Sequence, residues 1–406
     1  MSDADISRAP KVLLVAGEPS GDSHGAELIL ALKRLRPGLR CLGVGGPRMK
    51  AAGQEQMYDL SAHAVVGLVE VAKHYPQLRG VFDRVVKLAK EEKPDAVVFI
   101  DYPGFNLRLA KVLKKAVPRT KQVYYISPQV WAWKAGRAKT MEKLLDRLLV
   151  IFPFEKDWFA QHAPGLRVDW VGHPIWDRMM AQDLSLTPAD SRTGHGTKEA
   201  PLRVALLPGS REAELRKHLP ILVRAARELR ARRKDVHFVW LVPDDAKQRM
   251  GRKLIAAAGG DDLHIESYVG YSLSHLSRCD LALLASGTVS MEAACLGVPQ
   301  IVFYKANPIT YWIGRRIVKI RFLSMVNILV DREVVPEYIQ SDLDPVALAR
   351  HAAALLDDPV LRNDIRKEMR RAVERLGEPG ASTRAARSVL DEIGAAPIVP
   401  SASAPA

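Results

Sequence analysis

The chain has 406 residues, of which 48% are hydrophobic and 26% are charged, and its formal net charge is +14. This balance excludes a chain too polar to build cores, and the length predicts two or three domains. The basic surplus favours an anionic partner, namely a phosphorylated ligand, an acidic membrane surface or nucleic acid, unless it only reflects a generally high isoelectric point.

The N-terminal and cysteine patterns both indicate a cytosolic protein. Residues 1–10 lack the apolar core of a signal peptide and are expected to be disordered. Cys41, Cys279 and Cys295 lack metal-ligand spacing, which predicts reduced, buried thiols. The most apolar window, 281–303, contains Glu292 and is interrupted by glycines and a proline, so it predicts alternating short elements instead of a membrane span.

Short apolar runs in the first half predict strands that alternate with helices. Strands are expected at 12–16, 40–44, 96–100, 122–126, 147–152 and 168–171, and helices include 25–35, 108–116 and 138–145. This alternation predicts a mostly parallel, doubly wound α/β sheet, so we assign residues 11–181 to an N-terminal Rossmann-like domain. The polar segment 182–200 is expected to be a linker.

The second half repeats the plan. Strands are expected at 204–207, 238–242, 264–267, 281–285 and 300–303, with helices at 215–231, 247–257 and 290–296 between them. We assign 201–344 to a second Rossmann-like domain and expect the two domains to face a shared cleft. Residues 345–394 are helical and charged in pattern, and the tail 395–406, mostly Ala, Pro and Ser, is expected to be disordered.

Two polar motifs follow strands in the first half. Glu18, Ser20 and Asp22 come directly after the first strand, at the end of a parallel strand where α/β proteins bind ligands. Asp101 follows the very apolar strand 96–100. Partial desolvation would raise the pKa of such a carboxyl and suit it to general-base work, but a helix N-cap is an equal interpretation.

The matching positions of the second half favour phosphate binding. Arg211 follows a strand-to-helix turn and could neutralise a diphosphate without a metal, although it could also be a surface arginine. Ser286, Gly287 and Thr288 precede a helix, whose free N–H groups favour phosphate. Glu292, one turn later, could reach a sugar hydroxyl or complete a capping pattern.

Other segments leave two interpretations open. The tryptophan-rich segment 126–134 predicts a site wall or a packed aromatic corner, and His173 points into the cleft or caps a hinge. The segment 327–340 offers amides and a carboxylate for sugar and phosphate oxygens, or is an irregular polar loop. The amphipathic segments 65–86 and 311–326 suit interfacial helices on anionic lipid, or ordinary helices that face a core.

Eight of these motifs, in this order, resemble the lipid-A-disaccharide synthases, which are glycosyltransferases with two Rossmann-like domains (GT-B type). The matching segments are 16–22, 43–49, 100–106, 127–133, 171–174, 207–211, 285–288 and 327–340. The resemblance covers residues 11–340, and the helices that follow also fit it. It departs from the family around 191–197 and after Gly394.

The resemblance implies a reaction. UDP-2,3-diacylglucosamine would donate its sugar to the 6-hydroxyl of 2,3-diacylglucosamine 1-phosphate, with inversion, giving a β-1,6-linked disaccharide 1-phosphate and UDP. Asp101 is the implied base, with Glu18, Ser20 and Asp22 near the acceptor, and His24 is a rival base because its ordinary pKa suits neutral pH.

The resemblance also implies a donor site and a cellular setting. Arg211, Ser286, Gly287, Thr288 and Asn327 would bind the UDP phosphates, Glu292 the ribose, and Glu337 and Gln340 the donor sugar or nucleotide. No metal-ligand cluster stands out near these turns, which agrees with transfer without metal or cofactor. We expect a cytoplasmic enzyme held peripherally on anionic inner-membrane lipid. C-terminal helices would pack back on the first domain, and the arginine-rich stretch 364–376 would serve there or in a homodimer.

Other functions predict different patterns. A UDP-N-acetylglucosamine 2-epimerase or a peptidoglycan-type transferase shares the fold, but the first-half motifs argue against both. A nucleic-acid-binding protein would carry clustered basic runs, whereas the basic residues here are mixed with acidic ones along helices. A non-catalytic membrane scaffold is disfavoured because the polar turn residues of both halves would then have no function.

Overall fold

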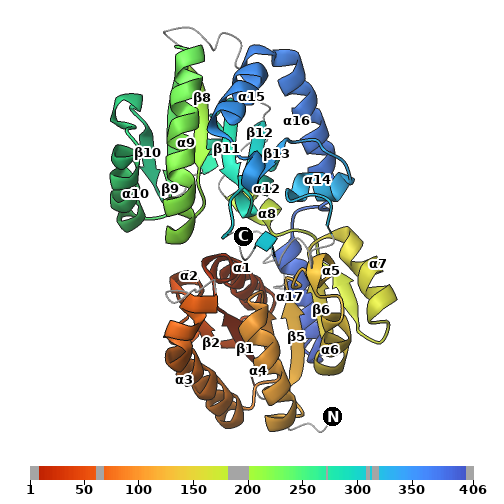
Figure 1. Ribbon diagram of the computed structural model, residues 1–406. Helices are drawn as coiled ribbons and strands as arrows, with labels where there is room; N and C mark the ends of the chain where they lie inside the picture. The colour runs from red at the N-terminus through yellow and green to blue at the C-terminus, as the bar shows by residue number, and fades with distance from the viewer. Residues whose placement is uncertain are drawn as a thin grey trace, which may run out of the picture. The chain divides into compact units, whose positions relative to one another are not determined.

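The computed structural model describes residues 9–60, 68–181, 201–270, 273–307, 311–312 and 320–398. The chain divides into two compact units, each built on its own sheet (Figure 1). Unit 1 comprises Met1–Arg178 together with Leu376–Ala406, and unit 2 comprises Met179–Arg375. The chain therefore leaves unit 1 once and returns to it at its C-terminal end.

Unit 1 has a parallel sheet in the order β3-β2-β1-β4-β5-β6-β7. Its strands are β1 (Lys11–Ala16), β2 (Arg40–Gly45), β3 (Glu55–Asp59), β4 (Ala96–Ile100), β5 (Lys121–Tyr125), β6 (Arg147–Val150) and β7 (Val168–Trp170). The central strands are short apolar runs that are buried on both faces, as parallel sheets require. The strand order reverses between β1 and β4, and this reversal is the topological switch point.

Helices cover both faces of this sheet. The helices are α1 (Pro19–Leu35), α2 (Pro47–Ala51), α3 (Leu68–Glu92), α4 (Pro103–Ala116), α5 (Val130–Trp133), α6 (Arg137–Leu144), α7 (Pro153–His162), α8 (Ile175–Ala181) at the boundary between the units, and α17 (Ala381–Glu392). On one face, Leu13 and Phe99 of the sheet share a core with Val85 of α3 and Leu109 of α4. On the other, α1 and α17 pack along each other, and α17 contacts β4, β5 and β6.

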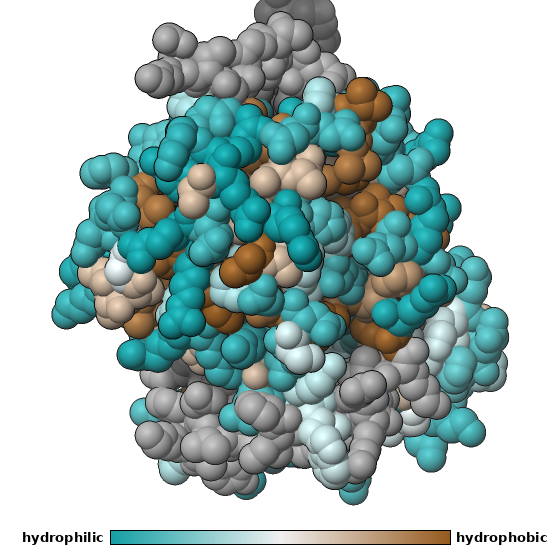
Figure 2. All heavy atoms as spheres, turned by 45° about the horizontal axis from the view of Figure 1, so that its top comes forward, coloured by the Kyte–Doolittle hydropathy of each residue, from teal (hydrophilic) through white to brown (hydrophobic). Residues whose placement is uncertain are grey.

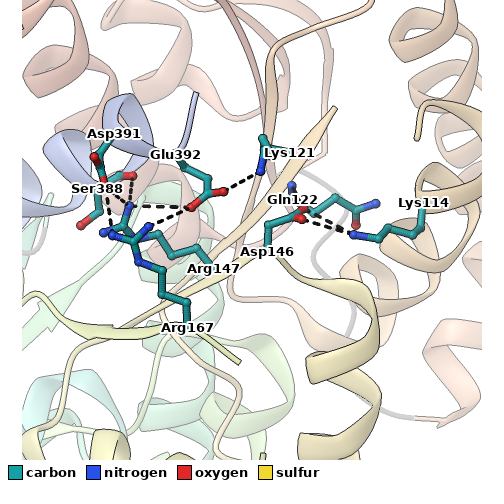
Figure 3. Close-up of polar contacts among 9 residues, drawn as sticks. All are labelled: Lys114, Lys121, Gln122, Asp146, Arg147, Arg167, Ser388, Asp391 and Glu392. Atoms are coloured by element: carbon teal, nitrogen blue, oxygen red, sulfur yellow. Dashed lines mark hydrogen bonds and ion pairs between the residues drawn. The ribbon is translucent and has the colours of Figure 1, made fainter. Parts of the chain in front are cut away.

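A mostly buried arginine fastens α17 to unit 1 (Figure 3). Arg147, at the start of β6, donates to Asp169 of β7 at 2.5 Å and to Asp391 of α17 at 2.8 Å. It also donates to the carbonyl of Ser388 at 2.8 Å. Glu392 lies 3.8 Å from the same guanidinium and 3.0 Å from Lys121. The arginine holds the pKa of the Asp391 carboxyl below its usual range.

Unit 2 has a parallel sheet in the order β10-β9-β8-β11-β12-β13. Its strands are β8 (Leu202–Leu207), β9 (Val236–Val242), β10 (Glu266–Val269), β11 (Leu281–Ala285), β12 (Gln300–Tyr304) and β13 (Glu337–Ile339). The order reverses between β8 and β11, so this unit has its own switch point.

The helices of unit 2 form two groups. They are α9 (Glu212–Arg232), α10 (Asp245–Ala257), α11 (Leu273–Leu276), α12 (Thr288–Cys295), α14 (Met325–Val330), α15 (Pro345–Asp357) and α16 (Pro359–Glu374), with 3-10 turns at Asp261–Leu263 and Gln340–Asp342. Helices α10 and α15 pack along α9, whereas α14 and α16 pack on α12.

The predicted α/β architecture is confirmed, with several local differences. The first helix begins at Pro19 and not near Gly25, because a proline is well suited to the first helical position. The strands β3 and β13 were not predicted, since neither is an apolar run. A C-terminal helix does pack back on unit 1, but it is α17; the stretch 364–376 belongs mainly to α16, which stays in unit 2.

The segments predicted to meet lipid lie partly outside the described residues. In the described part of the first segment, Val81 and Val85 of α3 are buried in the core of unit 1, which favours the interpretation as an ordinary core-facing helix. Among the described helices, none combines the length and apolar character needed to cross a membrane. The three cysteines are buried thiols outside any disulfide, as predicted, and burial raises the pKa of the Cys41 thiol to about 12.

Replacing Arg147 with methionine should loosen α17. The change keeps much of the side-chain volume but leaves Asp169 and Glu392 without their shared partner, so we expect the free energy of unfolding of unit 1 to fall by about 2–3 kcal/mol. Arg167 is the matched control, because it contacts Asp391 and Glu392 of α17 but is half exposed. Arg167→Met should lower the free energy of unfolding by less than about 1 kcal/mol. Urea unfolding followed by fluorescence measures both. Equal losses would show that Arg147 is not the main fastening.

Candidate functional site

The first candidate site lies at the switch point of unit 1. Ala16 of β1 pairs with Ile100 of β4, so Gly17 and Asp101 leave the sheet from neighbouring positions. The two polar motifs of the first half therefore start side by side. Because the loops after β1 and β4 diverge at a switch point, ligand-binding groups can stand between them.

Close packing ties these two loops together. The ring of Tyr102 lies against Gly17, where any Cβ would overlap the ring carbons. Burial, and next the Glu18 carboxylate, raise the pKa of the Tyr102 hydroxyl, so Glu18 also stands near this ring. The structure thus brings Glu18, Asp101 and Tyr102 to one place.

Asp101 has an unusual backbone. Its φ is 46°, and that of Tyr102 is 48°, so two successive residues with side chains adopt the left-handed region. The Asp101 N–H donates to the carbonyl of Tyr125 at 3.2 Å. Its carbonyl accepts from Asn106 Nδ2 at 2.7 Å and from the Tyr124 hydroxyl at 2.5 Å. The side chain is half-buried.

Asp22 is occupied by backbone donors. Its buried carboxylate accepts from the N–H groups of Gly46, Arg48 and Met49 at 2.8–3.0 Å, which caps the start of α2. Ser20, in the first turn of α1, is half-buried. Asp22 therefore fixes the loop after β2 beside the site.

The two histidines of the predicted site are both buried. His24 lies inside α1 and is 6% exposed, with Nδ1 4.0 Å from Oε2 of Glu27 on the same helix. His173 is also buried; its Nδ1 accepts from the N–H of Ile175 at 3.1 Å. Burial, and next the neighbouring His24 and Arg178, lower the pKa of His173 to about 3. A ring with this bonding caps a local turn in its neutral form.

The tryptophan-rich segment divides into a buried and an exposed part. Trp131 donates Nε1 to Glu155 at 3.1 Å, and burial raises the pKa of that carboxyl to about 7. Trp133 is exposed, and the Lys134 ammonium lies 4.1 Å from its ring centroid. Trp131 thus belongs to a packed aromatic corner, whereas a site wall around Trp133 stays a prediction.

The second candidate site lies at the switch point of unit 2. Leu207 of β8 pairs with Leu284 of β11, so the turns that contain Arg211 and Ser286 leave the sheet together. Gly287 and Thr288 are exposed at the start of α12, whereas Glu292 is buried one turn later. The Ser286 hydroxyl donates to the carbonyl of Leu323 at 3.1 Å, which brings a third loop to this edge.

Glu214 organises the turn around Arg211. Its carboxylate accepts from the N–H groups of Ser210 and Arg211 at 3.0 and 3.1 Å and lies 3.4 Å from the Arg211 guanidinium. The Arg211 side chain is about half exposed, at 46%. The cation is therefore aimed by its neighbour and remains accessible to solvent.

The polar side chains of segment 327–340 mainly form hydrogen bonds with the main chain of neighbouring loops. Asn327 is fully buried and bonds to the main chain of Val334 and Val335, and it donates to the Glu337 carboxylate at 2.8 Å. That carboxylate also accepts from the N–H groups of Leu323 and Ser324 at 2.8 Å. Gln340 accepts from the N–H of Ala306 at 2.6 Å. These residues hold the loops before α14 and after β12 in place.

His218 is a buried polar residue that was not among the predicted site residues. It is fully buried on α9, and its Nδ1 lies 2.6 Å from the Pro208 carbonyl. Its Nε2 lies 3.2 Å from the N–H of Lys305. A carbonyl needs a donor and an N–H needs an acceptor, so the ring is neutral with its proton on Nδ1. The spacing of Leu215, His218 and Leu222 on one helical face was the available signal.

No metal-ligand cluster accompanies these residues. Across the parts of the chain that the structure describes, no group of three or more His, Cys, Asp and Glu side chains is arranged to hold a metal ion.

Comparisons with known proteins identify relatives over nearly the whole chain. The family described as lipid-A-disaccharide synthetase matches residues 12–391. A lipid-A-disaccharide synthase of Geobacter sulfurreducens is 38% identical over 387 residues, which are 95% of this chain and 97% of the relative. One of Myxococcus xanthus is 38% identical over 388 residues, covering 95% and 98%.

Solved structures share the fold at low identity. A putative UDP-N-acetylglucosamine 2-epimerase from Listeria monocytogenes has a TM-score of 0.65 at 16% identity, covering 95% of this chain and 96% of its own. The Neisseria meningitidis UDP-GlcNAc 2-epimerase bound to UDP-GlcNAc has 0.64 at 14%, covering 94% and 100%. A calicheamicin glycosyltransferase has 0.53 at 18%, covering 98% and 100%. The predicted GT-B fold is confirmed by these neighbours.

His218 should make the stability of unit 2 depend on pH. Burial lowers its pKa, so below the ordinary histidine value of about 6.5 the unfolded chain binds a proton that the folded ring resists. The free energy of unfolding should therefore fall as the pH drops from 7.5 to 5.5, by at most about 1.4 kcal/mol per pH unit for this one proton. In His218→Gln this part of the fall should be absent, whereas a surface control, His264→Asn, should retain it. Urea unfolding at both pH values measures it, and identical pH dependence in wild type and His218→Gln would exclude this role.

Proposed function

Because the chain belongs to the lipid-A-disaccharide synthase family, we propose that it transfers the sugar of UDP-2,3-diacylglucosamine to the 6-hydroxyl of 2,3-diacylglucosamine 1-phosphate. The products are the β-1,6-linked disaccharide 1-phosphate and UDP. The observation that carries this proposal is the family match from 12 to 391, which includes both switch points and most of α17. The general role, a UDP-sugar glycosyltransferase of lipid A biosynthesis, follows from membership.

The reaction inverts the anomeric carbon of the donor. The acceptor oxygen attacks C1 from the face opposite the diphosphate and forms the new C1–O6 bond. The bond from C1 to the phosphate oxygen breaks, and its electron pair leaves on the β-phosphate of UDP. The proton of the 6-hydroxyl passes to a base. The logic is that of inverting glycosidases, with a sugar hydroxyl in place of water.

Asp101 is the proposed base, and unit 1 is the proposed acceptor unit. Asp101 follows β4 directly at the switch point, in a backbone conformation that residues with side chains rarely adopt. Strained residues of this kind cluster at functional sites. Glu18 and Ser20 contact the acceptor in this proposal, and Asp22 holds the neighbouring loop. His24 is the less suitable base because it is buried inside α1.

Unit 2 is the proposed donor unit. Arg211 and the N–H groups at Gly287 and Thr288 bind the diphosphate and stabilise the charge that develops on the leaving oxygen. Ser286 lines the same turn, and Glu292 contacts the ribose. Asn327, Glu337 and Gln340 act mainly by holding the loops that present these groups.

The enzyme works at the cytoplasmic face of the inner membrane in this proposal. Both substrates carry acyl chains, and a net charge of +14 favours an anionic lipid surface. On the face drawn in Figure 2, hydrophilic residues cover most of the surface and hydrophobic ones lie between them.

Purified protein with both substrates in detergent tests the proposed reaction. Mass spectrometry should detect the tetraacyl disaccharide 1-phosphate and UDP, and EDTA should leave the rate unchanged. A rate that returns only with Mg²⁺ would contradict the account of the leaving group. UDP-N-acetylglucosamine alone is the control for the epimerase alternative, and its conversion to an epimer without disaccharide formation would contradict the proposal.

Asp101→Asn tests the base. The variant should lose turnover by about 10²–10⁴-fold, the usual contribution of general-base catalysis, and should still bind UDP with wild-type affinity. Asp157→Asn, an exposed carboxylate on α7 of the same unit, is the matched control and should behave as wild type. Turnover assays and calorimetric titration of UDP measure the two properties. Near-normal turnover in Asp101→Asn, with a loss in His24→Gln, would transfer the role to His24.

A further inference from the structure

The Asp101 side chain does not by itself account for the backbone conformation of this residue. Asp101 and Tyr102 both lie in the left-handed region, at φ 46° and 48°. For residues with a Cβ, this conformation is unfavourable because the Cβ comes too close to the following carbonyl oxygen. It persists only where surrounding contacts enforce it. The contacts that enforce it here come from two side chains that no step of the reaction uses.

Asn106 and Tyr124 both donate to the carbonyl of Asp101. The Asn106 amide lies 2.7 Å from that oxygen, and the Tyr124 hydroxyl lies 2.5 Å from it. Both side chains are fully buried. Together with the bond from the Asp101 N–H to the carbonyl of Tyr125, they fix both polar groups of the Asp101 main chain. The Asp101 carboxylate then has little freedom other than its own rotamers.

The orientation of the Asn106 amide follows from its neighbours. Its Nδ2 also lies 3.3 Å from the carbonyl of Ile100 and 3.5 Å from that of Val15. A flipped amide would place its oxygen against three carbonyl oxygens, so the nitrogen must face them. Val15 belongs to β1 and Ile100 to β4. Asn106 therefore joins the two strands at the point where the sheet reverses its order.

Tyr124 remains a donor throughout the working pH range. Burial, and next the charge of Asp101, hold the pKa of its hydroxyl well above the ordinary value. Its neighbour on β5, Tyr125, is equally buried, but the hydroxyl of Tyr125 lies near Glu27 and Ser382 instead. Adjacent residues of a strand point to opposite faces of the sheet, which explains the difference.

We propose that Asn106 and Tyr124 are positioning residues that hold Asp101 in the conformation needed to accept the proton of the acceptor hydroxyl. The proposal rests on the proposed role of Asp101 as base. Without these two donors, the Asp101 carbonyl turns away and the residue relaxes toward a common backbone conformation. The carboxylate then leaves its place at the end of β4. A displacement of about 1 Å at a reacting group is enough to slow a reaction substantially.

Tyr124→Phe and Tyr125→Phe form a matched pair of tests, because each removes one buried hydroxyl from the same strand. Tyr124→Phe should lower kcat roughly tenfold, with the acceptor KM and the UDP affinity unchanged. Tyr125→Phe should leave kcat within about twofold of wild type, because the Tyr125 hydroxyl is buried without a hydrogen-bond partner among the described residues and its removal releases no main-chain group there. Equal kcat values in the two variants would overturn the proposal.

A double variant separates positioning from a general structural effect. If Tyr124 acts through Asp101, adding Tyr124→Phe to Asp101→Asn should not reduce the residual turnover further. A further tenfold loss would show that Tyr124 acts by another route and would overturn the proposal. Should Asp101→Asn alone retain turnover, the proposed base itself would fail, which is a distinguishable result.

Asn106→Asp provides an independent check of the other donor. The two side chains have nearly the same shape, but a carboxylate cannot donate to the three carbonyls, so kcat should fall by more than in Tyr124→Phe. If Asn106→Asp fails to fold, the tyrosine pair still decides the proposal. A folded Asn106→Asp with wild-type kcat would overturn it.

Discussion

The reversal of strand order in each parallel sheet is the constraint on which the remaining structure depends. Where β1 and β4, or β8 and β11, run side by side, the connections that follow them turn to opposite faces. Backbone groups at this edge lose their partners in the sheet, and buried polar groups must find others. The same divergence opens the space in which a ligand can be held. Both units therefore place their polar motifs there.

Many polar side chains of the motifs form hydrogen bonds with the main chain. Asp22 and Glu337 accept from N–H groups that begin short helices, and Asn106 and Asn327 satisfy main-chain groups of neighbouring loops. His218 does the same between two loops of unit 2. Fewer side chains of the motifs, among them Arg211 and Thr288, are exposed and accessible to a ligand. Each motif at this edge therefore contains residues that stabilise the loops and residues that are available to bind a ligand.

The sequence was sufficient for the regular parts of the fold and for the place of the polar motifs at the ends of strands. Apolar runs such as β4 and β11 are unambiguous because both faces are buried. The edge strands β3 and β13 lacked this signal, since polar residues tolerate an edge. Residue types alone could not tell that Asn327 bonds to the main chain, or that Asp101 has a positive φ. The first depends on how the loop after α14 folds back on Asn327, and the second on a contact with Tyr124 of the next strand.

In the proposed function, the two switch points divide the substrates, with the donor on unit 2 and the acceptor on unit 1. Hydrogen exchange with UDP alone tests it most directly, because a diphosphate that bonds to N–H groups slows their exchange. The account predicts slower exchange in 208–211, 286–290 and 323–327, with 17–24 and 101–106 unchanged. Protection of 17–24 by UDP, without protection of 286–290, would contradict it.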